Sequence, residues 1–403
     1  MLRPDCGGEY FETITADSIS VDGELSLAMA TPAEVRKSVP IFEETRYLNT
    51  GASGPSPRQI VERAQETIEA HEWDAAADPG PYPYAFGIYD DARENVASFV
   101  GAEADEIALT QSTTDGINRI ACSIEWEPGD VIVRTDLEHP AGVLPWQRLE
   151  RQGCEVRVAP TSDGRIDRDA YRDAVADAKL VCLSALTWNY GTHLPVEELV
   201  ADAHDAGARV LVDAVQVPGQ CDLDVSEWGA DAVAMASHKW LLGLWGGGFL
   251  YVNDAAIDDL HPGQIGYRSV ADASDDDYEL KDSAARFEIG TTNPAPYAAL
   301  SESIDLLESV GLDTIESHIH DLASQFVDGV PDERLVSPRE PESGLVTVRV
   351  DDPESTVERL KQEYDIVVRS LPSPKGAIRA SLHVYNNAAD VDRLLDGLDE
   401  IGW

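Results

Sequence analysis

Short apolar runs alternate with amphipathic segments along most of this chain. From about residue 47 onward, the apolar runs predict strands over residues 107–110, 131–135, 155–159, 180–184, 209–213, 232–236 and 247–252. A helical period between several of them predicts helices over residues 141–152, 168–177 and 196–206. Strands that alternate with helices in this way are typical of an α/β fold. We therefore predict a mainly parallel, seven-stranded sheet between two layers of helices.

The pattern changes at about residue 296. A long helix is expected over residues 297–310, and shorter helices and strands follow to the end of the chain. These features predict a large domain over residues 47–296 and a smaller C-terminal α+β domain over residues 297–403. Residues 29–46 include Thr31, a good N-cap for a helix, and we expect this segment to pack on the small domain. Residues 1–28 are polar, acidic and weakly periodic, so a disordered extension is expected there.

The charge balance of the chain is strongly acidic. Its 75 Asp and Glu residues outnumber its 30 Lys and Arg residues, which gives a formal net charge of −45. Such a surface repels nucleic acid and anionic lipid, so we expect neither as a partner. Only six of the basic residues are Lys. An acid-rich, Lys-poor surface is typical of proteins from salt-loving microbes, in which salt screens the self-repulsion.

Cysteine usage and apolar segments indicate the compartment. The five cysteines are odd in number and lack the paired spacing of a metal site. Cys154 and Cys182 lie in or beside apolar runs and are interpreted as small core residues. No apolar stretch reaches the roughly 18 residues needed to span a membrane. The N-terminus lacks the basic-then-apolar layout of a signal peptide. We therefore expect a cytoplasmic protein.

Two of the predicted strands end in residues that carry chemistry. The run 209–213 ends in Asp213, and the run 232–236 is followed by Ser237, His238 and Lys239. Ligands of open α/β sheets bind beyond the carboxyl ends of the strands. A lysine amine forms an imine with the aldehyde of pyridoxal 5'-phosphate (PLP), and a carboxylate pairs with its pyridinium nitrogen. Taken singly, such an Asp is usually a cap and such a Lys is usually solvated, but the pair predicts a PLP site.

Three further turns offer groups that suit this cofactor. Thr113 and Thr114 lie where a strand turns into a helix, and free N–H groups at such a turn bind phosphate, although hydroxyl residues there are also ordinary caps. His139 follows the run 131–135 and can stack on a flat ring. Asn189 follows the run 180–184 and can hydrogen-bond a phenolate oxygen.

Together these segments resemble the class V aminotransferase family, which includes the cysteine desulfurases, among the fold type I PLP-dependent enzymes. The resemblance extends over about residues 45–400 and keeps the family order. The matching stretches are residues 47–52 (YLNTGA), 112–118 (STTDGIN), 138–141 (EHPA), 188–192 (WNYGT), 212–216 (VDAVQ), 237–240 (SHKW), 286–291 (RFEIGT) and 379–386 (RASLHVYN).

The resemblance implies the PLP-dependent transferase fold type I and a role for each matched residue. Lys239 is implied to bind PLP and to move the proton at the substrate α-carbon, and Asp213 to pair with the pyridinium nitrogen. The other implied cofactor contacts are Gln216 and Asn189 to the ring hydroxyl, His139 stacked on the ring, and Thr113, Thr114, Ser237 and His238 to the phosphate.

Two more implied roles concern the partner subunit and the substrate. Thr291 resembles the threonine that reaches the phosphate of the neighbouring subunit, which implies a homodimer with shared active sites. Arg379 resembles the arginine that grips the substrate carboxylate, a task that suits a planar guanidinium. Arg369 is expected either to assist Arg379 or to form a structural salt bridge.

The implied activity is that of a PLP-dependent enzyme that acts on an α-amino acid. We favour transamination, with C–S lysis second and epimerisation as a further alternative. The desulfurases of the family need a reactive cysteine on a loop between the positions of Arg369 and Arg379. Here the corresponding stretch, residues 370–378, is short and contains no Cys. Persulfide-forming desulfurase activity is therefore not expected.

Two other classes of function compete with this prediction. A PLP-binding protein without activity is disfavoured because Lys239, Asp213, His139 and Arg379 are all retained. In a metalloenzyme, His238, His139 and Asp213 could bind a metal, but no pair has the short spacing of a metal site, so no metal is expected.

The aromatic stretch over residues 79–87 allows two interpretations. It either lines the mouth of the active site or forms a packed loop ahead of a helix over residues 89–100.

Overall fold

The computed structural model describes residues 30–275 and 277–403, so the extension predicted for residues 1–28 lies outside the described residues. Its α-helices are α1 (Pro32–Ser38), α2 (Arg58–Glu69), α3 (Pro81–Val100), α4 (Thr113–Ala121), α5 (Leu144–Glu150), α6 (Arg168–Val175), α7 (Val196–Asp205), α8 (Ala295–Val310), α9 (Leu312–Asp328), α10 (Pro353–Tyr364) and α11 (Ala388–Ile401).

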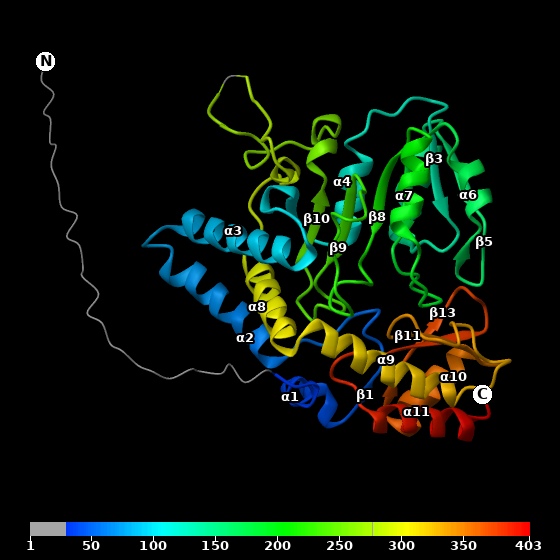
Figure 1. Cartoon of the computed structure of the whole chain (residues 1–403). Coiled ribbons are helices and arrows are strands. Elements are labelled where there is room, and N and C mark those ends of the chain that lie inside the picture. Colours follow the sequence, from blue (N-terminus) through cyan, green and yellow to red (C-terminus); the bar gives the residue numbers. More distant parts are fainter. Residues whose placement is uncertain (1–29, 276) are drawn as a thin grey trace, which may run out of the picture.

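A seven-stranded sheet organises the larger part of the molecule (Figure 1). In spatial order its strands are β2 (Ile107–Thr110), β10 (Gly248–Val252), β9 (Ala232–Ala236), β8 (Arg209–Asp213), β7 (Ala178–Ser184), β3 (Val131–Thr135) and β4 (Glu155–Ala159). Strand β10 is antiparallel to both of its neighbours, and every other adjacent pair is parallel. The predicted α/β fold with a mainly parallel seven-stranded sheet is confirmed.

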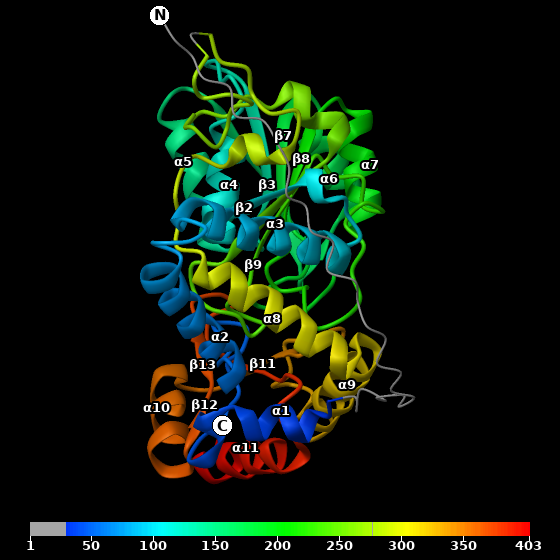
Figure 2. The same cartoon turned by 90° about the vertical axis from the view of Figure 1, so that its left-hand side faces the viewer.

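Helices cover both faces of this sheet, as Figure 2 shows in the view along its edge. Along β8, Val210 and Val212 belong to the core shared with α3, α6 and α7, whereas Leu211 belongs to the core shared with α4 and α5. Successive side chains of a strand point to opposite faces, so a strand covered on both sides must be apolar throughout. This is why the central strands read as continuous apolar runs in the sequence.

A second, antiparallel sheet lies in the C-terminal part, with the order β11 (Leu345–Arg349), β14 (Ala377–Ser381) and β13 (Arg369–Leu371). Strand β1 (Arg46–Tyr47) pairs with β12 (Ile366–Val367), and β5 (Thr161–Ser162) pairs with β6 (Arg165–Ile166). A separate apolar core forms here from Leu48 and from residues between Leu322 and Trp403. Helix α8 lies against α2 and α3. The domain boundary at residues 296 and 297 stays a prediction.

The N-terminal segment contacts the C-terminal part of the chain. Thr31 caps α1 through a capping box with Glu34, as the sequence predicts. From α1, Arg36 forms an ion pair of 2.7 Å with Asp390 of α11 and donates to the carbonyl of Tyr385. The helix lies beside α11 in both views of the fold (Figures 1 and 2).

Two local predictions were wrong. Residues 81–87 are not a loop, because α3 begins at Pro81. Pro81 and Pro83 lie in the first turn, where the missing amide hydrogen costs no helical hydrogen bond. The helix predicted over residues 141–152 is divided into a 3-10 turn, Pro140–Gly142, and α5, which has Pro145 in its own first turn.

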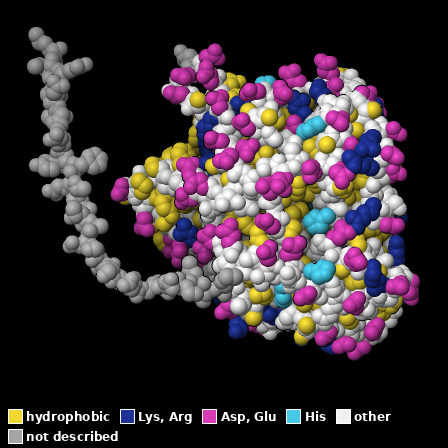
Figure 3. Space-filling model, viewed as in Figure 1, with side chains coloured by type: hydrophobic (Ala, Val, Ile, Leu, Met, Phe, Trp, Pro, Cys, Tyr) yellow, Lys and Arg dark blue, Asp and Glu magenta, His cyan; other side chains and the backbone are white. Residues whose placement is uncertain are grey.

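The surface carries the acidic side chains over the whole visible face (Figure 3). Hydrophobic side chains gather over the tip that the ends of α2 and α3 form. Large exposed aromatic residues near this tip and the active site include Trp73, Tyr82, Phe86 and Trp245, the first and last of which are 70% and 74% exposed. Patches of this kind mark interfaces, but the homodimer stays a prediction. No helix among the described residues is long and apolar enough to cross a membrane.

Candidate active site

A cavity of about 150 Å³ lies at the carboxyl ends of the central strands. Because β7, β8 and β9 are parallel and adjacent, the turns that follow them open at the same edge of the sheet. The cavity is lined by Gly51, Ala52, Ser112, Thr113, Thr114, His139, Ala141, Trp188, Asp213, Val215, Gln216, His238, Lys239 and Arg369. The sequence-predicted residues that it brings together are therefore Thr113, Thr114, His139, Asp213, Gln216, His238, Lys239 and Arg369.

Lys239 is a half-buried amine in the turn that follows β9. Burial lowers the pKa of Lys239 to about 8, an effect that nearby Asp213 opposes and that Arg379 and Arg369 reinforce. A fraction of the amine is therefore neutral near pH 7 and available as a nucleophile or a base.

Asp213 ends β8 and is 5% exposed. Its Oδ1 accepts a hydrogen bond of 3.1 Å from the Val215 amide. Burial raises the pKa of Asp213, whereas the Lys239 cation and the Val215 amide lower it. A positive partner in the cavity favours the ionised form of this carboxylate, and a pyridinium nitrogen would be such a partner.

A second buried carboxyl group, Glu138, lies behind this site. It accepts hydrogen bonds of 2.6 Å from the hydroxyl groups of Thr135 and Ser184, and Ser184 is the neighbour of Asp213 across β7 and β8. Burial raises the pKa of Glu138 to about 7, and the negative charge of Asp213 acts in the same direction. The two carboxyl groups therefore differ in access to the cavity, because Asp213 lines it and Glu138 does not.

His139 lies beside Trp188 at the cavity wall, with ring centroids 5.6 Å apart in an edge-to-face arrangement. Burial lowers the pKa of His139 to about 4, and the cations of Lys239, Arg369 and Arg379 add to the effect. The imidazole is thus neutral at neutral pH. A neutral, half-buried ring is suited to stacking on a flat ligand, as the resemblance implies.

Arg379 is a fully buried guanidinium behind the cavity. Its Nη1 donates a hydrogen bond of 2.6 Å to the carbonyl of Trp188, while Nε and Nη2 have no partner among the described residues. Burial and the adjacent Arg369 lower the pKa of Arg379 to about 9. A carboxylate bound by two guanidinium nitrogens would satisfy both orphaned donors.

Arg369 lies directly opposite Arg379 on the paired strands β13 and β14. Within the described part of the chain it has no ion pair, and its guanidinium carbon lies 5.8 Å from the centre of the Trp188 ring. Like charges directly across a strand pair are destabilising. The structural salt bridge left open for Arg369 is thus not formed, and an anion between the two arginines is favoured.

The phosphate turn is built at the start of α4. Ser112 caps the helix and accepts a hydrogen bond from the Asp115 amide, and the buried hydroxyl of Thr113 has no partner in residues 30–275 and 277–403. A side chain at Gly248 would place its first carbon 2.5 Å from the Ser112 nitrogen, so only glycine allows β10 to approach this turn. A helix N-terminus with an unpartnered hydroxyl suits an anion.

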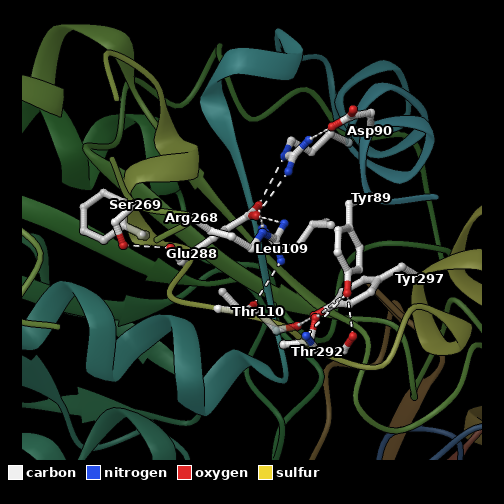
Figure 4. Close-up of polar contacts among 12 residues, drawn as sticks. Tyr89, Asp90, Leu109, Thr110, Arg268, Ser269, Glu288, Thr292 and Tyr297 are labelled. Atoms are coloured by element: carbon white, nitrogen blue, oxygen red, sulfur yellow. Dashed lines mark hydrogen bonds and ion pairs between the residues drawn. The ribbon is translucent and has the colours of Figure 1, made fainter. Parts of the chain in front are cut away.

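A buried ion cluster fixes the strand that leads into this turn (Figure 4). Glu288 accepts hydrogen bonds from Arg93, from Arg268 and, at 2.9 Å, from the Leu109 amide on β2. The segment that carries Thr291 is thereby tied to β2. Thr291 itself is exposed and does not line the cavity of this chain.

The remaining predicted residues differ in their availability. Asn189 is buried, and its Oδ1 has no partner among residues 30–275 and 277–403, while its side-chain amide donates to the Ser373 carbonyl at 3.3 Å. The Ser237 hydroxyl lies 2.7 Å from each of the carbonyls of Leu244 and Gly247, outside the cavity lining. Trp188, Glu138 and the buried His383 were given no role from the sequence, although all three lie within matched motifs.

The donor set therefore fits PLP. The cavity offers a low-pKa amine, a buried carboxylate, a neutral imidazole and a helix N-terminus, and unpartnered polar atoms remain on Thr113, Asn189 and Arg379 in the described structure.

Comparisons with known proteins agree with this arrangement. The family profile described as "Aminotransferase class-V" matches residues 46–394. A "Probable cysteine desulfurase" of Methanothermobacter thermautotrophicus is 33% identical over 395 residues, which cover 91% of this chain and 97% of that protein. The apo cysteine desulfurase from Thermococcus onnurineus NA1 has a TM-score of 0.84 at 31% identity, and the match covers 93% and 98% of the two chains. The complex of the cystine C–S lyase C-DES with its product cysteine persulfide has a TM-score of 0.84 at 25% identity, with 89% and 98% covered.

Proposed function

Because this chain belongs to the class V aminotransferase family of PLP-dependent enzymes, we propose that it acts on an α-amino acid whose carboxylate binds Arg379 and whose α-proton is taken by Lys239. The observation that carries the proposal is the buried Arg379 guanidinium, whose Nε and Nη2 have no partner among the described residues. An uncompensated buried cation is costly, and it is retained where a ligand pairs with it. The nearby neutral fraction of the Lys239 amine completes the requirement for an acid–base group.

The residues that would hold PLP line the cavity, except for Asn189 and Thr291, which lie outside its lining. Lys239 would hold its aldehyde, Asp213 its ring nitrogen, His139 the ring face, Asn189 and Gln216 the ring hydroxyl, and Thr113 and Thr114 the phosphate, with the exposed Thr291 left for a neighbouring subunit. When bound, PLP supplies an aldehyde that combines with amines and a ring that accepts electron density from the α-carbon.

The protein groups then divide the remaining work. Arg379 fixes the carboxylate, so the α-carbon lies on the side of the cavity that carries Lys239. The Nζ atom of Lys239 accepts the α-proton, and its lowered pKa keeps part of the amine unprotonated near neutral pH. Asp213, at the end of β8, places a carboxylate in the cavity. Its negative charge would stabilise a protonated ring nitrogen of PLP. The neutral His139 adds no further positive charge to the site.

The proton balance of Lys239 gives a prediction about pH. The rate at which the protein without cofactor captures PLP should rise with pH, reach half of its maximum near pH 8 and level off above it, because only the neutral amine reacts and its pKa is lowered to about 8. In Asp213→Asn the plateau should begin at a lower pH, because Asp213 is the group that raises the pKa of Lys239. Stopped-flow absorbance would measure the rates. A rate that keeps rising to the ordinary lysine range above pH 10 would contradict the buried amine.

C–S lysis is the outcome that we now place ahead of transamination. The relatives described above are named for cleaving sulfur from cysteine or cystine. Desulfurases pass that sulfur to a protein thiol, but β13 and β14 are joined here by residues 372–376 without a cysteine. The described cysteines Cys122, Cys154, Cys182 and Cys221 do not line the cavity. In the proposed reaction the Cα–H and Cβ–S bonds break, and the sulfur leaves as hydrogen sulfide from cysteine or as cysteine persulfide from cystine. Water added to the remaining three-carbon fragment gives pyruvate and ammonia.

Product analysis tests this choice. With cysteine or cystine as substrate, pyruvate and ammonia should form in equal amounts, together with sulfide or cysteine persulfide. The double variant Cys122→Ser, Cys221→Ser should turn over at the wild-type rate, because no protein thiol takes part. Alanine as the main product, lost in that variant, would indicate a desulfurase. A keto acid product that retains the sulfur would instead identify the reaction as transamination.

A further inference from the structure

The backbone carbonyl that follows Lys239 is held by a side chain from a distant part of the chain. The Nε2 atom of His383 donates a hydrogen bond of 2.7 Å to the carbonyl oxygen of Trp240. His383 is 0% exposed, and its ring packs edge-on against the rings of Trp240 and Tyr385 at centroid distances of 5.2 and 5.4 Å. None of these contacts reaches the cavity, so His383 is not a ligand of the bound molecules.

The turn that this hydrogen bond supports is strained. Leu242 has a φ of 59°, in the left-handed region that a branched, bulky side chain rarely adopts. Its amide donates to the Lys239 carbonyl at 3.1 Å, so the strained residue closes the turn that begins at Lys239. Strain of this kind persists only where surrounding contacts fix the backbone. The peptide between Trp240 and Leu241 lies inside the turn, and His383 fixes its carbonyl end.

His383 acts as a neutral donor. Burial lowers the pKa of His383 to about 3, so the ring is uncharged over the physiological range. Because its partner is a carbonyl, Nε2 carries the hydrogen, and Nδ1 is then a buried acceptor without a partner in the described residues. A buried unpaired acceptor is costly. An aliphatic or aromatic residue would avoid that cost, so the cost indicates that the Nε2 donor is required at this position.

The same segment also carries the carboxylate clamp. Arg379 lies on β14, and His383 follows it by four residues. The backbone of His383 is fixed by its amide, which donates to Asn386 Oδ1 at 2.9 Å. The ring of Trp240 is fixed from the other side, since its Nε1 donates to Gln216 Oε1 at 2.7 Å. The contact thus joins the strand that carries the clamp to the turn that carries the amine.

We propose that His383 is a positioning residue for Lys239, which holds the strained turn through the Trp240 carbonyl and thereby sets the amine relative to the Arg379 clamp. The inference rests on the proposed role of Lys239. Misplacement of a reacting group by about 1 Å costs about 10²-fold in rate. Loss of this one donor should therefore lower reactivity at Lys239 without removing any group from the cavity.

The test compares His383→Phe with His383→Gln. Phenylalanine keeps the packing against Trp240 and Tyr385 but has no donor, whereas the amide of glutamine reaches the position of Nε2. We expect His383→Phe to lower kcat by about 10-fold to 10²-fold with KM changed less than about threefold. The rate of PLP capture without any amino acid should fall in proportion. His383→Gln should restore both rates to within about threefold of wild type.

Three results would overturn this role. In the first, His383→Phe captures PLP and turns over within twofold of wild type. In the second, His383→Gln is as impaired as His383→Phe. The third result concerns a replacement variant, His383→Asn, which is used if His383→Phe does not fold. The shorter amide of asparagine cannot reach the Trp240 carbonyl, so equal rates of PLP capture in His383→Asn and His383→Gln would contradict the role. Failure of the proposed function is separate, because it would appear as PLP capture by Lys239→Ala at the wild-type rate.

Discussion

Lys239→Ala is expected to lose the visible absorbance of bound PLP and to lose turnover by at least about 10²-fold to 10⁴-fold, the usual contribution of a positioned acid–base group. The loss of turnover should be larger than that of any other single substitution, because one amine both holds the cofactor and moves the proton. Lys375→Ala is the matched control, since Lys375 is an exposed lysine on the turn between β13 and β14. Absorbance and steady-state rates of the two variants would be compared.

The opposite result for Lys239→Ala would contradict the proposed site. If Lys239→Ala kept both the absorbance and the turnover, the cofactor would be held elsewhere, and the site proposed at the ends of β8 and β9 would be wrong. A variant that kept the absorbance but lost turnover would divide the two roles and leave Lys239 as a base only.

Arg379→Gln is expected to lower kcat/KM by about 10²-fold to 10⁴-fold. The variant removes two charge-assisted hydrogen bonds to the substrate carboxylate, each worth about 1.5–3 kcal/mol, and a loss of 1.36 kcal/mol is about tenfold. The melting temperature of the cofactor-free protein is expected to change in the opposite direction. It should rise, because glutamine can still donate to the Trp188 carbonyl while an uncompensated buried cation is removed.

Arg349→Gln provides the control for this pair of effects, because Arg349 is exposed at the end of β11 in the same sheet. It should change neither kcat/KM nor the melting temperature appreciably. An Arg379→Gln variant with wild-type kcat/KM and a lower melting temperature would mean that Arg379 is structural, and the substrate carboxylate would then bind elsewhere.

The central sheet could be predicted from the sequence because its strands are buried on both faces. Five of the seven strands have the predicted bounds, for instance β8 and β9, whose apolar runs end abruptly in Asp213 and before Ser237. The start of α3 could not be predicted from the sequence, because Pro81 and Pro83 indicate a loop unless they are known to lie in a first helical turn. Strand β7 begins two residues early, at Ala178, where pairing with Val131 of β3 adds residues that apolar character alone does not indicate.

The part of the active site that short sequence motifs indicate could be predicted. Lys239 and Asp213 were placed by the rule that ligands bind beyond strand ends, and the structure puts both in one cavity. The contact between His383 and the Trp240 carbonyl joins residues 143 positions apart. No local pattern indicates a hydrogen bond to a backbone carbonyl, so His383 could be seen only as one letter of a matched motif.

The position of the cofactor is tested most directly by reducing the PLP-loaded protein with borohydride and mapping the modified lysine by peptide mass spectrometry. The chain has six lysines, and only Lys239 lines the cavity in the described structure. We predict that the pyridoxyl group is found on the peptide that contains Lys239, and that the same peptide from the Lys239→Ala variant carries no pyridoxyl group. A pyridoxyl group on any of the other five lysines, with the Lys239 peptide unmodified, would contradict the proposed site.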